Sequence, residues 1–76
     1  MITYSEESDA VYIQISDAKI VRTEIIDDAR FVDYDANGNV VGIELLGASG
    51  GLDLRDLPEQ KRLESEARVL NFPIFA

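Results

Sequence analysis

The chain has 76 residues, 15 acidic and 7 basic, which gives a formal net charge of −8, and it contains neither cysteine nor histidine. This composition excludes disulfide bonds, zinc sites built from Cys or His, and catalytic triads or pairs that need a His base. The negative charge argues against binding to nucleic acids or anionic membranes, because both need a basic surface to neutralise phosphate.

A chain of this length predicts one domain, residues 1–76, close to the lower size limit for an independent core. Such a domain buries only about 60% of the surface that its unfolded chain exposes. Because disulfides and a structural metal are absent, self-association is the common remaining remedy, and we expect a homodimer. We expect a cytoplasmic protein, since the N-terminal MITYSEES lacks the features of a secretion signal and no apolar run approaches the roughly 20 residues that span a bilayer.

Two short alternating segments open the chain, at residues 1–5 and 10–16, with a polar break at Glu6-Glu7-Ser8-Asp9 between them. Apolar residues fall at every second position in both segments, which is the period of a half-buried strand. The sequence therefore predicts a first hairpin. Its expected apolar members are Ile2, Tyr4, Val11, Ile13 and Ile15.

A third strand is predicted at residues 20–26, where two alternating sets of side chains compete for the inward face. One of these sets contains Arg22 and Glu24. Burial of unpaired charge is costly, so the other set is expected to face the core. That set is Val21, Thr23 and Ile25.

Residues 31–46, FVDYDANGNVVGIELL, predict the central hairpin. Asn37-Gly38 tolerates the positive φ angles of a tight turn, and the flanking runs have the length and β-branched composition of strands. Gly42 interrupts the second run and indicates a bulge or the close approach of a neighbouring backbone. The expected core face of this hairpin consists of Val32, Tyr34, Val41, Ile43 and Leu45.

The region after residue 47 predicts a helix at about residues 58–70 and an apolar tail at residues 71–76. Pro58 suits the first turn of a helix, and Asp56 is available as its N-terminal cap. The apolar stripe of this helix is narrow (Leu57, Leu63, Ala67 and Leu70), so the helix depends on docking against the sheet. The tail ends the chain on Phe72, Ile74 and Phe75, which we expect either to cover their own sheet or to insert into a second copy.

One stretch of the central hairpin matches a metal-binding motif. Asp33, Asp35, Asn37 and Glu44 have the spacing D-x-D-x-N-G-x-x-x-x-x-E of an EF-hand calcium loop, in which oxygen atoms surround the ion. An EF-hand loop lies between two helices, whereas both flanks here have strand composition. We therefore expect no metal and no cofactor, and keep these four residues as candidate ligands of an alternative metal-binding or small-ligand-binding function.

Catalysis is not expected. The serines have no candidate base except Lys19 and Lys61, and neither lysine lies in an apolar segment that would lower its pKa. Acid–base work by paired carboxylates needs a pocket that excludes water, for which a chain of this size leaves little room. The acidic residues on alternate strand positions are interpreted as a solvated face.

Two segments resemble a known family: Y-S-E-E-S-D-A-V-Y-I-Q-I-S at residues 4–16 and V-D-Y-D-A-N-G-N-V-V-G-I-E-L-L-G-A-S at residues 32–49. Over about residues 2–51 the chain resembles the bacterial and archaeal family catalogued as domain of unknown function 2283. Where that family favours Y-D, this chain has Tyr4-Ser5. The resemblance implies a small antiparallel sheet with a helix, assigns no activity, and suggests an acidic antitoxin-like partner of small toxin-like proteins.

These observations predict an α+β domain: a small antiparallel sheet of about five strands over residues 1–47, arranged as a meander of hairpins, with one C-terminal helix and an apolar tail. The charge is uneven, because residues 1–51 carry ten acidic and three basic side chains. Such a surface attracts basic partners. We therefore expect a non-enzymatic module that self-associates through Phe72, Ile74 and Phe75, with a basic protein as a second candidate partner.

Overall fold

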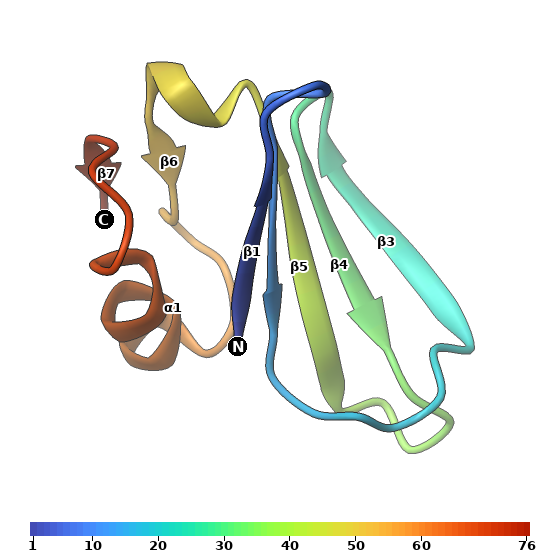
Figure 1. Ribbon diagram of the computed structural model, residues 1–76. Coiled ribbons are helices and arrows are strands. Elements are labelled where there is room, and N and C mark those ends of the chain that lie inside the picture. Colours follow the sequence, from blue (N-terminus) through green and yellow to red (C-terminus); the bar gives the residue numbers. More distant parts are fainter.

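Five strands form one antiparallel sheet in the computed structural model, which describes residues 1–76 (Figure 1). The strands are β1 (Ile2–Ser5), β2 (Ala10–Gln14), β3 (Arg22–Asp27), β4 (Arg30–Tyr34) and β5 (Val40–Leu46). This architecture confirms the predicted α+β class, the number of strands and the hairpins β1–β2, β3–β4 and β4–β5.

The strand order is β1-β2-β5-β4-β3, so the three hairpins do not form a simple meander. β2 pairs with β5 instead of β3, with Ile13 opposite Ile43 and Val11 opposite Leu45. This pairing joins the two strands with the most completely buried residues at the centre of the sheet. The segment between β2 and β3 is tied to β5, because the amides of Ile15 and Ser16 donate to the carbonyl of Val41 at 2.7 and 3.1 Å.

The C-terminal third of the chain packs on one face of the sheet. It consists of a 3-10 turn (Ala48–Gly50), β6 (Leu52–Asp53), α1 (Gln60–Ala67) and β7 (Ile74–Phe75). Figure 1 shows α1, β6 and β7 together on the side of β1 and β2, with β3 at the far edge of the sheet. The buried core between the two layers consists of Val11, Ile13, Val32, Ile43, Leu45, Ala48, Leu52, Leu54, Leu57, Leu63 and Ala67.

The central hairpin is confirmed, and its turn is closed by one side chain. Oδ1 of Asp35 accepts hydrogen bonds from the backbone amides of Asn37 and Asn39, each at 2.9 Å. Gly38 has φ 79°, a conformation that glycine adopts without a steric penalty. Val32, Val41, Ile43 and Leu45 are buried on the predicted core face.

The predicted inward face of the third strand is wrong. Val21, Thr23 and Ile25 are exposed, and Ile26 is the residue that packs against the core. Arg22 and Glu24 lie opposite Tyr34 and Val32, on the side of the C-terminal layer. Both remain exposed, because that layer stops short of β3 (Figure 1). The prediction assumed that this face is covered along its whole width. At β3 it is not covered, so Arg22 and Glu24 lie on it without the cost of burying charge.

The helix is shorter than the predicted span of about residues 58–70. It covers eight residues and buries Leu63 and Ala67, as the predicted docking stripe requires. Asp56 does not cap it. Glu59, with φ 59°, takes the cap position and makes no side-chain hydrogen bond there. No helix of this chain is long and apolar enough to cross a membrane.

The apolar tail folds back onto its own domain. The ring of Phe72 meets the ring of Tyr4 edge to face, with centroids 5.0 Å apart. Ile74 packs against the core, and β7 pairs in parallel with β6. Phe75 is 47% exposed and lies over Gly51. The tail was expected either to cover its own sheet or to insert into a second copy, and in this structure it packs on its own domain.

Candidate functional site

The face of the sheet opposite the C-terminal layer has no second layer over it, and we call it the open face. Its side chains alternate with those of the core face along every strand. The strand register aligns them in rows, of which the central one runs Thr3, Tyr12, Glu44, Phe31 and Ile25 from β1 to β3. The other members are Ser5, Ala10, Gln14, Gly42, Leu46, Asp33 and Thr23.

Three apolar side chains on the open face are exposed or half buried. Ile25 is 71% exposed, Leu46 is 38% exposed, and Phe31 is half buried between them. Large apolar groups that lie together on a sheet face are typical of interaction surfaces. The sequence had indicated Ile25 as a core residue, and its place on the open face became visible only when the strand register was known.

A hydrogen-bonded cluster lies next to these apolar groups. Tyr12 donates its hydroxyl proton to Oδ2 of Asp33 at 2.8 Å, and Thr23 donates to Oδ1 of the same carboxylate. The pKa of Tyr12 is raised well above its usual value. Partial burial is the largest cause, and the hydrogen bond to Asp33 is the next. The phenol therefore stays protonated, and both oxygens of Asp33 are occupied within the protein.

Gly42 makes this cluster geometrically feasible. The ring of Tyr12 crosses β5 directly above Gly42, where a Cβ atom would lie 2.2 Å from the tyrosine oxygen. The close approach predicted at Gly42 is present, but a side chain makes it rather than a backbone. The register shift predicted at this point also occurs, between Asp33 and Tyr34 on the opposing strand.

The four candidate metal ligands have separate tasks. Asp33 holds Tyr12 and Thr23, Asp35 closes the hairpin turn, and Glu44 lies in the central row of the open face. Asn37 uses its backbone amide in the turn. No group of three or more acidic side chains is placed to hold a metal ion.

We predict that calcium does not bind at this hairpin. Because both oxygens of Asp33 and Oδ1 of Asp35 already accept hydrogen bonds, an ion that used these atoms would have to break the Tyr12 and turn contacts. Isothermal titration with calcium is expected to give only dilution heat, identical for the wild type and Asp35→Asn. A saturable heat that Asp35→Asn abolishes would contradict this expectation.

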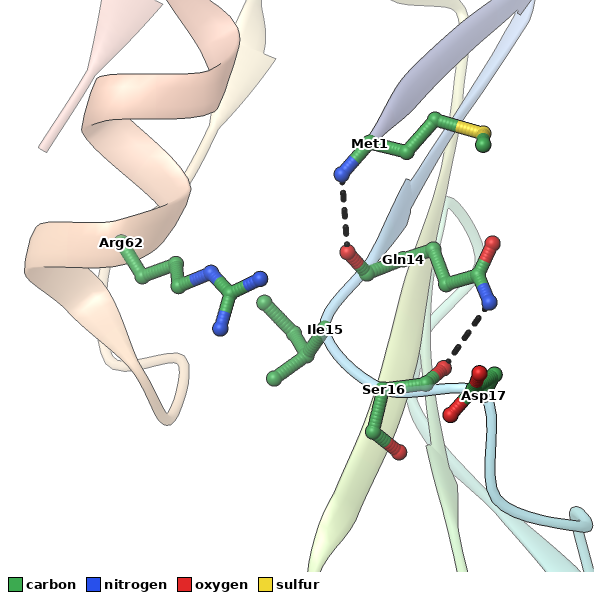
Figure 2. A pocket seen from close by; sticks show the side chains of 6 residues that line it. All are labelled: Met1, Gln14, Ile15, Ser16, Asp17 and Arg62. Carbon is green, nitrogen blue, oxygen red and sulfur yellow. Dashed lines mark hydrogen bonds between the residues drawn. The ribbon is translucent and has the colours of Figure 1, made fainter.

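The larger of two hollows, about 280 Å³, lies between α1 and the end of β2. It is lined by Met1, Gln14, Ile15, Ser16, Asp17 and Arg62. Figure 2 shows Arg62 extending from α1 toward Ile15, while Gln14 donates to the carbonyl of Ser16 at 3.0 Å. Asp17 is the one carboxylate in this lining, so the hollow offers no pair of acids for catalysis.

The smaller hollow, about 120 Å³, is lined in part by Arg30, which joins the sheet to the C-terminal layer. The guanidinium of Arg30 donates to Oδ2 of Asp27 at 2.8 Å and to the carbonyl of Arg55 at 2.7 Å, and it lies 3.7 Å from Asp53. Hydrogen bonds from Arg55 lower the pKa of Asp53 to about 2, and those from the Ala29 amide and Arg30 lower the pKa of Asp27. Both acids are ionised at neutral pH, so neither serves as a proton donor.

The ion pairs of Asp53 predict a measurable dependence of stability on pH. The pKa of Asp53 is depressed in the folded protein, so its stabilising effect is present above the unfolded value of 3.8 and is lost as the pH falls toward about 2. Asp53→Asn is expected to lower the melting temperature at pH 7, with a difference from wild type that narrows between pH 4 and 2. Circular dichroism melts at several pH values check this, and a constant difference would contradict it.

Comparison with known proteins gives three findings. The family model described as "Protein of unknown function (DUF2283)" matches residues 1–49. An uncharacterized protein of Methanocaldococcus jannaschii is 44% identical over 48 residues, which are 63% of this chain and 40% of that protein, so this chain spans less than half of its relative's length. No solved structure matches. The matched residues contain the complete five-stranded sheet with its open face, and β6, α1 and β7 lie outside them.

Proposed function

The chain belongs to the family described as protein of unknown function (DUF2283), and from that premise we propose that it is a non-enzymatic protein-interaction module that docks a partner on its open face. The observation that carries this proposal is the difference between the two faces of the sheet. One carries the C-terminal layer, which stops short of β3, while the other leaves Ile25, Phe31 and Leu46 without cover. Neither the fold nor the comparisons point to catalysis.

The charge of the open face supports a basic protein as the partner. Asp33 and Glu44 lie on it, and none of its members is basic. The basic side chains of the sheet are elsewhere: Arg30 binds Asp27, and Arg22 stacks 4.1 Å above the ring of Tyr34. A surface with apolar groups and one sign of charge attracts and orients a partner of the opposite charge. An antitoxin-like role, in which this acidic domain covers a basic protein, agrees with such a surface.

Two matched lysine substitutions test the docking face. Ile25→Lys places a cation on the open face, and Val69→Lys makes the same change just after α1, where the side chain is 72% exposed. Tagged wild-type and variant domains are used to capture proteins from lysate of the source cells. We expect wild type and Val69→Lys to capture the same protein in stoichiometric amount and Ile25→Lys to lose it. Equal capture by both variants would refute docking on the open face.

Self-association is the second candidate function, and the exposed apolar side chains at the free edge of the sheet favour it. Ile20 and Val21 precede β3 and Ile25 lies within it, and all three are exposed. The tail residues first proposed for this role are differently placed: Phe72 and Ile74 pack against their own core, which leaves Phe75 as the tail residue that presents an exposed apolar ring.

Sedimentation velocity over a wide concentration range separates the two self-association surfaces. If the β3 edge forms the contact, Ile25→Lys is expected to be monomeric while Phe75→Ala and Val69→Lys remain dimeric. If the tail forms it, Phe75→Ala alone dissociates. A monomeric wild type at every concentration would remove self-association as a function and would leave docking on the open face unaffected.

A further inference from the structure

We propose that Glu44, with the aromatic residues Tyr12 and Phe31 opposite it on the neighbouring strands, forms a binding site for the guanidinium group of an arginine side chain on the partner protein. This inference rests on the proposed function, because it names the chemical group that the open face recognises. The site occupies the centre of the sheet and is built from three adjacent strands, β2, β5 and β4.

The strand register sets the geometry of this site. Glu44 lies directly opposite Tyr12 on one side and directly opposite Phe31 on the other. Directly opposed residues of antiparallel strands have their Cβ atoms about 4.5–5.5 Å apart and their side chains on the same face. A carboxylate therefore lies between two aromatic side chains, all three of them half buried on the open face.

The side chain of Tyr12 is held in place before a ligand binds. Tyr12 lies across Gly42, and its hydroxyl is fixed by Asp33, which Thr23 holds from the other side. A ring that is already ordered loses little conformational entropy when a ligand stacks on it. The same contacts occupy both oxygens of Asp33, whereas the side chain of Glu44 makes no ion pair and no hydrogen bond within the chain. Glu44 is therefore the acceptor on the central row that remains for a partner.

Arginine fits this arrangement better than lysine does. The planar guanidinium group donates in a fork that matches a carboxylate and also stacks on aromatic faces, while an ammonium group is a compact, strongly hydrated charge. A cation above the face of a tyrosine or phenylalanine ring gains about 0.5–1 kcal/mol at an exposed site. Glu44 between two rings offers both interactions to a single side chain.

Charge argues against the open face of a second copy as the occupant of this open face. Two open faces stacked on each other would bring Glu44 and Asp33 of one copy against the same acids of the other, with no basic member on either face. Burying like charges without a counter-ion is costly. A partner that contributes an arginine supplies the missing cation, and its neighbouring apolar residues meet Ile25 and Leu46.

Three acetylated, amidated tripeptides test the site: Leu-Arg-Leu, Leu-Lys-Leu and Leu-citrulline-Leu, the last being a neutral mimic of the arginine peptide. Each is titrated into the ¹⁵N-labelled protein while amide shifts are followed by NMR. The arginine peptide is expected to shift the amides of Tyr12, Phe31 and Glu44 and to bind at least about threefold more tightly than either of the other two.

Variants of the protein identify the groups that are responsible. Glu44→Gln removes the charge and keeps the shape and both rings, and is expected to weaken binding of the arginine peptide by up to about fivefold, the value of an exposed ion pair. Glu7→Gln makes the same change in the exposed β1–β2 turn and is expected to leave the affinity unchanged. Tyr12→Phe keeps the ring without its clamp to Asp33, and Tyr12→Leu removes the ring. We expect the leucine variant to bind the arginine peptide less tightly than the phenylalanine variant.

The outcomes separate this inference from the proposed function. No shift with the arginine peptide, or an affinity that Glu44→Gln does not change, overturns the arginine site. If the citrulline peptide binds the same amides equally well, the open face docks apolar peptides and only the arginine site fails. Loss of partner capture in Ile25→Lys remains the independent test of docking itself.

Discussion

Replacing Ile43 with alanine is expected to lower the free energy of unfolding by about 3 kcal/mol, within the range measured for buried isoleucines. Ile43 is completely buried in the central strand β5, where Ile13 and Val32 lie opposite it on the two neighbouring strands. Truncation leaves a cavity that three strands and the C-terminal layer cannot fill by small movements. A domain of this size has a total stability of roughly 4–11 kcal/mol, so the loss is a large part of it.

Ile25→Ala is the matched control for this change. It removes the same atoms from the same residue type, but from a side chain that is 71% exposed on the opposite face. We expect it to change the stability by less than about 0.5 kcal/mol. Urea denaturation of both variants and the wild type provides the comparison. A similar loss in both variants would mean that the open face is covered, as self-association or a bound partner would cause.

Replacing Gly51 with alanine is expected to cost about 2 kcal/mol through backbone strain. Gly51 links the 3-10 turn to β6 with φ 133° and ψ 151°, a conformation that residues with a Cβ atom rarely adopt. The added Cβ atom would also lie 2.3 Å from the ring of Phe75. Gly50→Ala is the adjacent control, because its Cβ atom has nothing within 4 Å.

A double substitution separates the two costs at Gly51. In a Phe75→Ala background the steric contact is gone, so Gly51→Ala then measures the backbone strain alone. We expect most of the cost to remain, since an exposed phenylalanine ring can turn aside while the backbone cannot. A cost that disappears in the Phe75→Ala background would show that the contact, and not the φ angle, makes glycine necessary here.

The proposed docking on the open face depends on the division of the sheet into two unlike faces. Residues 48–76 cover one face, and Arg30 fastens this C-terminal layer to the sheet through Asp27, Asp53 and the carbonyl of Arg55. The sheet itself supplies the other face, with Glu44 at its centre. Changes at Arg30 and changes at Glu44 are therefore expected to act on different properties, stability in the first case and recognition in the second.

Several features could be predicted from neighbouring residues alone. Asn37-Gly38 between two β-branched runs determined the central hairpin, because its turn needs only local backbone conformations. Alternation in β2, β4 and β5 identified Val11, Ile13, Val32, Ile43 and Leu45 as buried, since side chains of a strand point to opposite faces in turn. Gly42 was predicted to mark a bulge or the close approach of a backbone, and a register shift does occur beside it.

The candidate site was largely hidden from sequence reasoning. Tyr12, Phe31 and Glu44 are separated along the chain by up to 32 positions, and only the pairing of β2 with β5 brings them into one row. The motif that did stand out, from Asp33 to Glu44, has the spacing of a calcium loop, although its residues lie on two paired strands and their turn. Spacing alone does not distinguish these two structures. The inward face of β3 was wrong for a related reason, since the sequence does not show how far the C-terminal layer extends.

Periodicity and turn chemistry between residues close together in the chain were enough to predict the α+β class, the hairpins and most of the core. The strand order, the packing of the tail and the exposure of the open face became visible only in the folded domain. Each of these depends on which distant surfaces bury each other, as the rings of Phe72 and Tyr4 do. Burial is a property of the assembled layers, so a strand whose two faces are both partly apolar does not reveal which face remains in water.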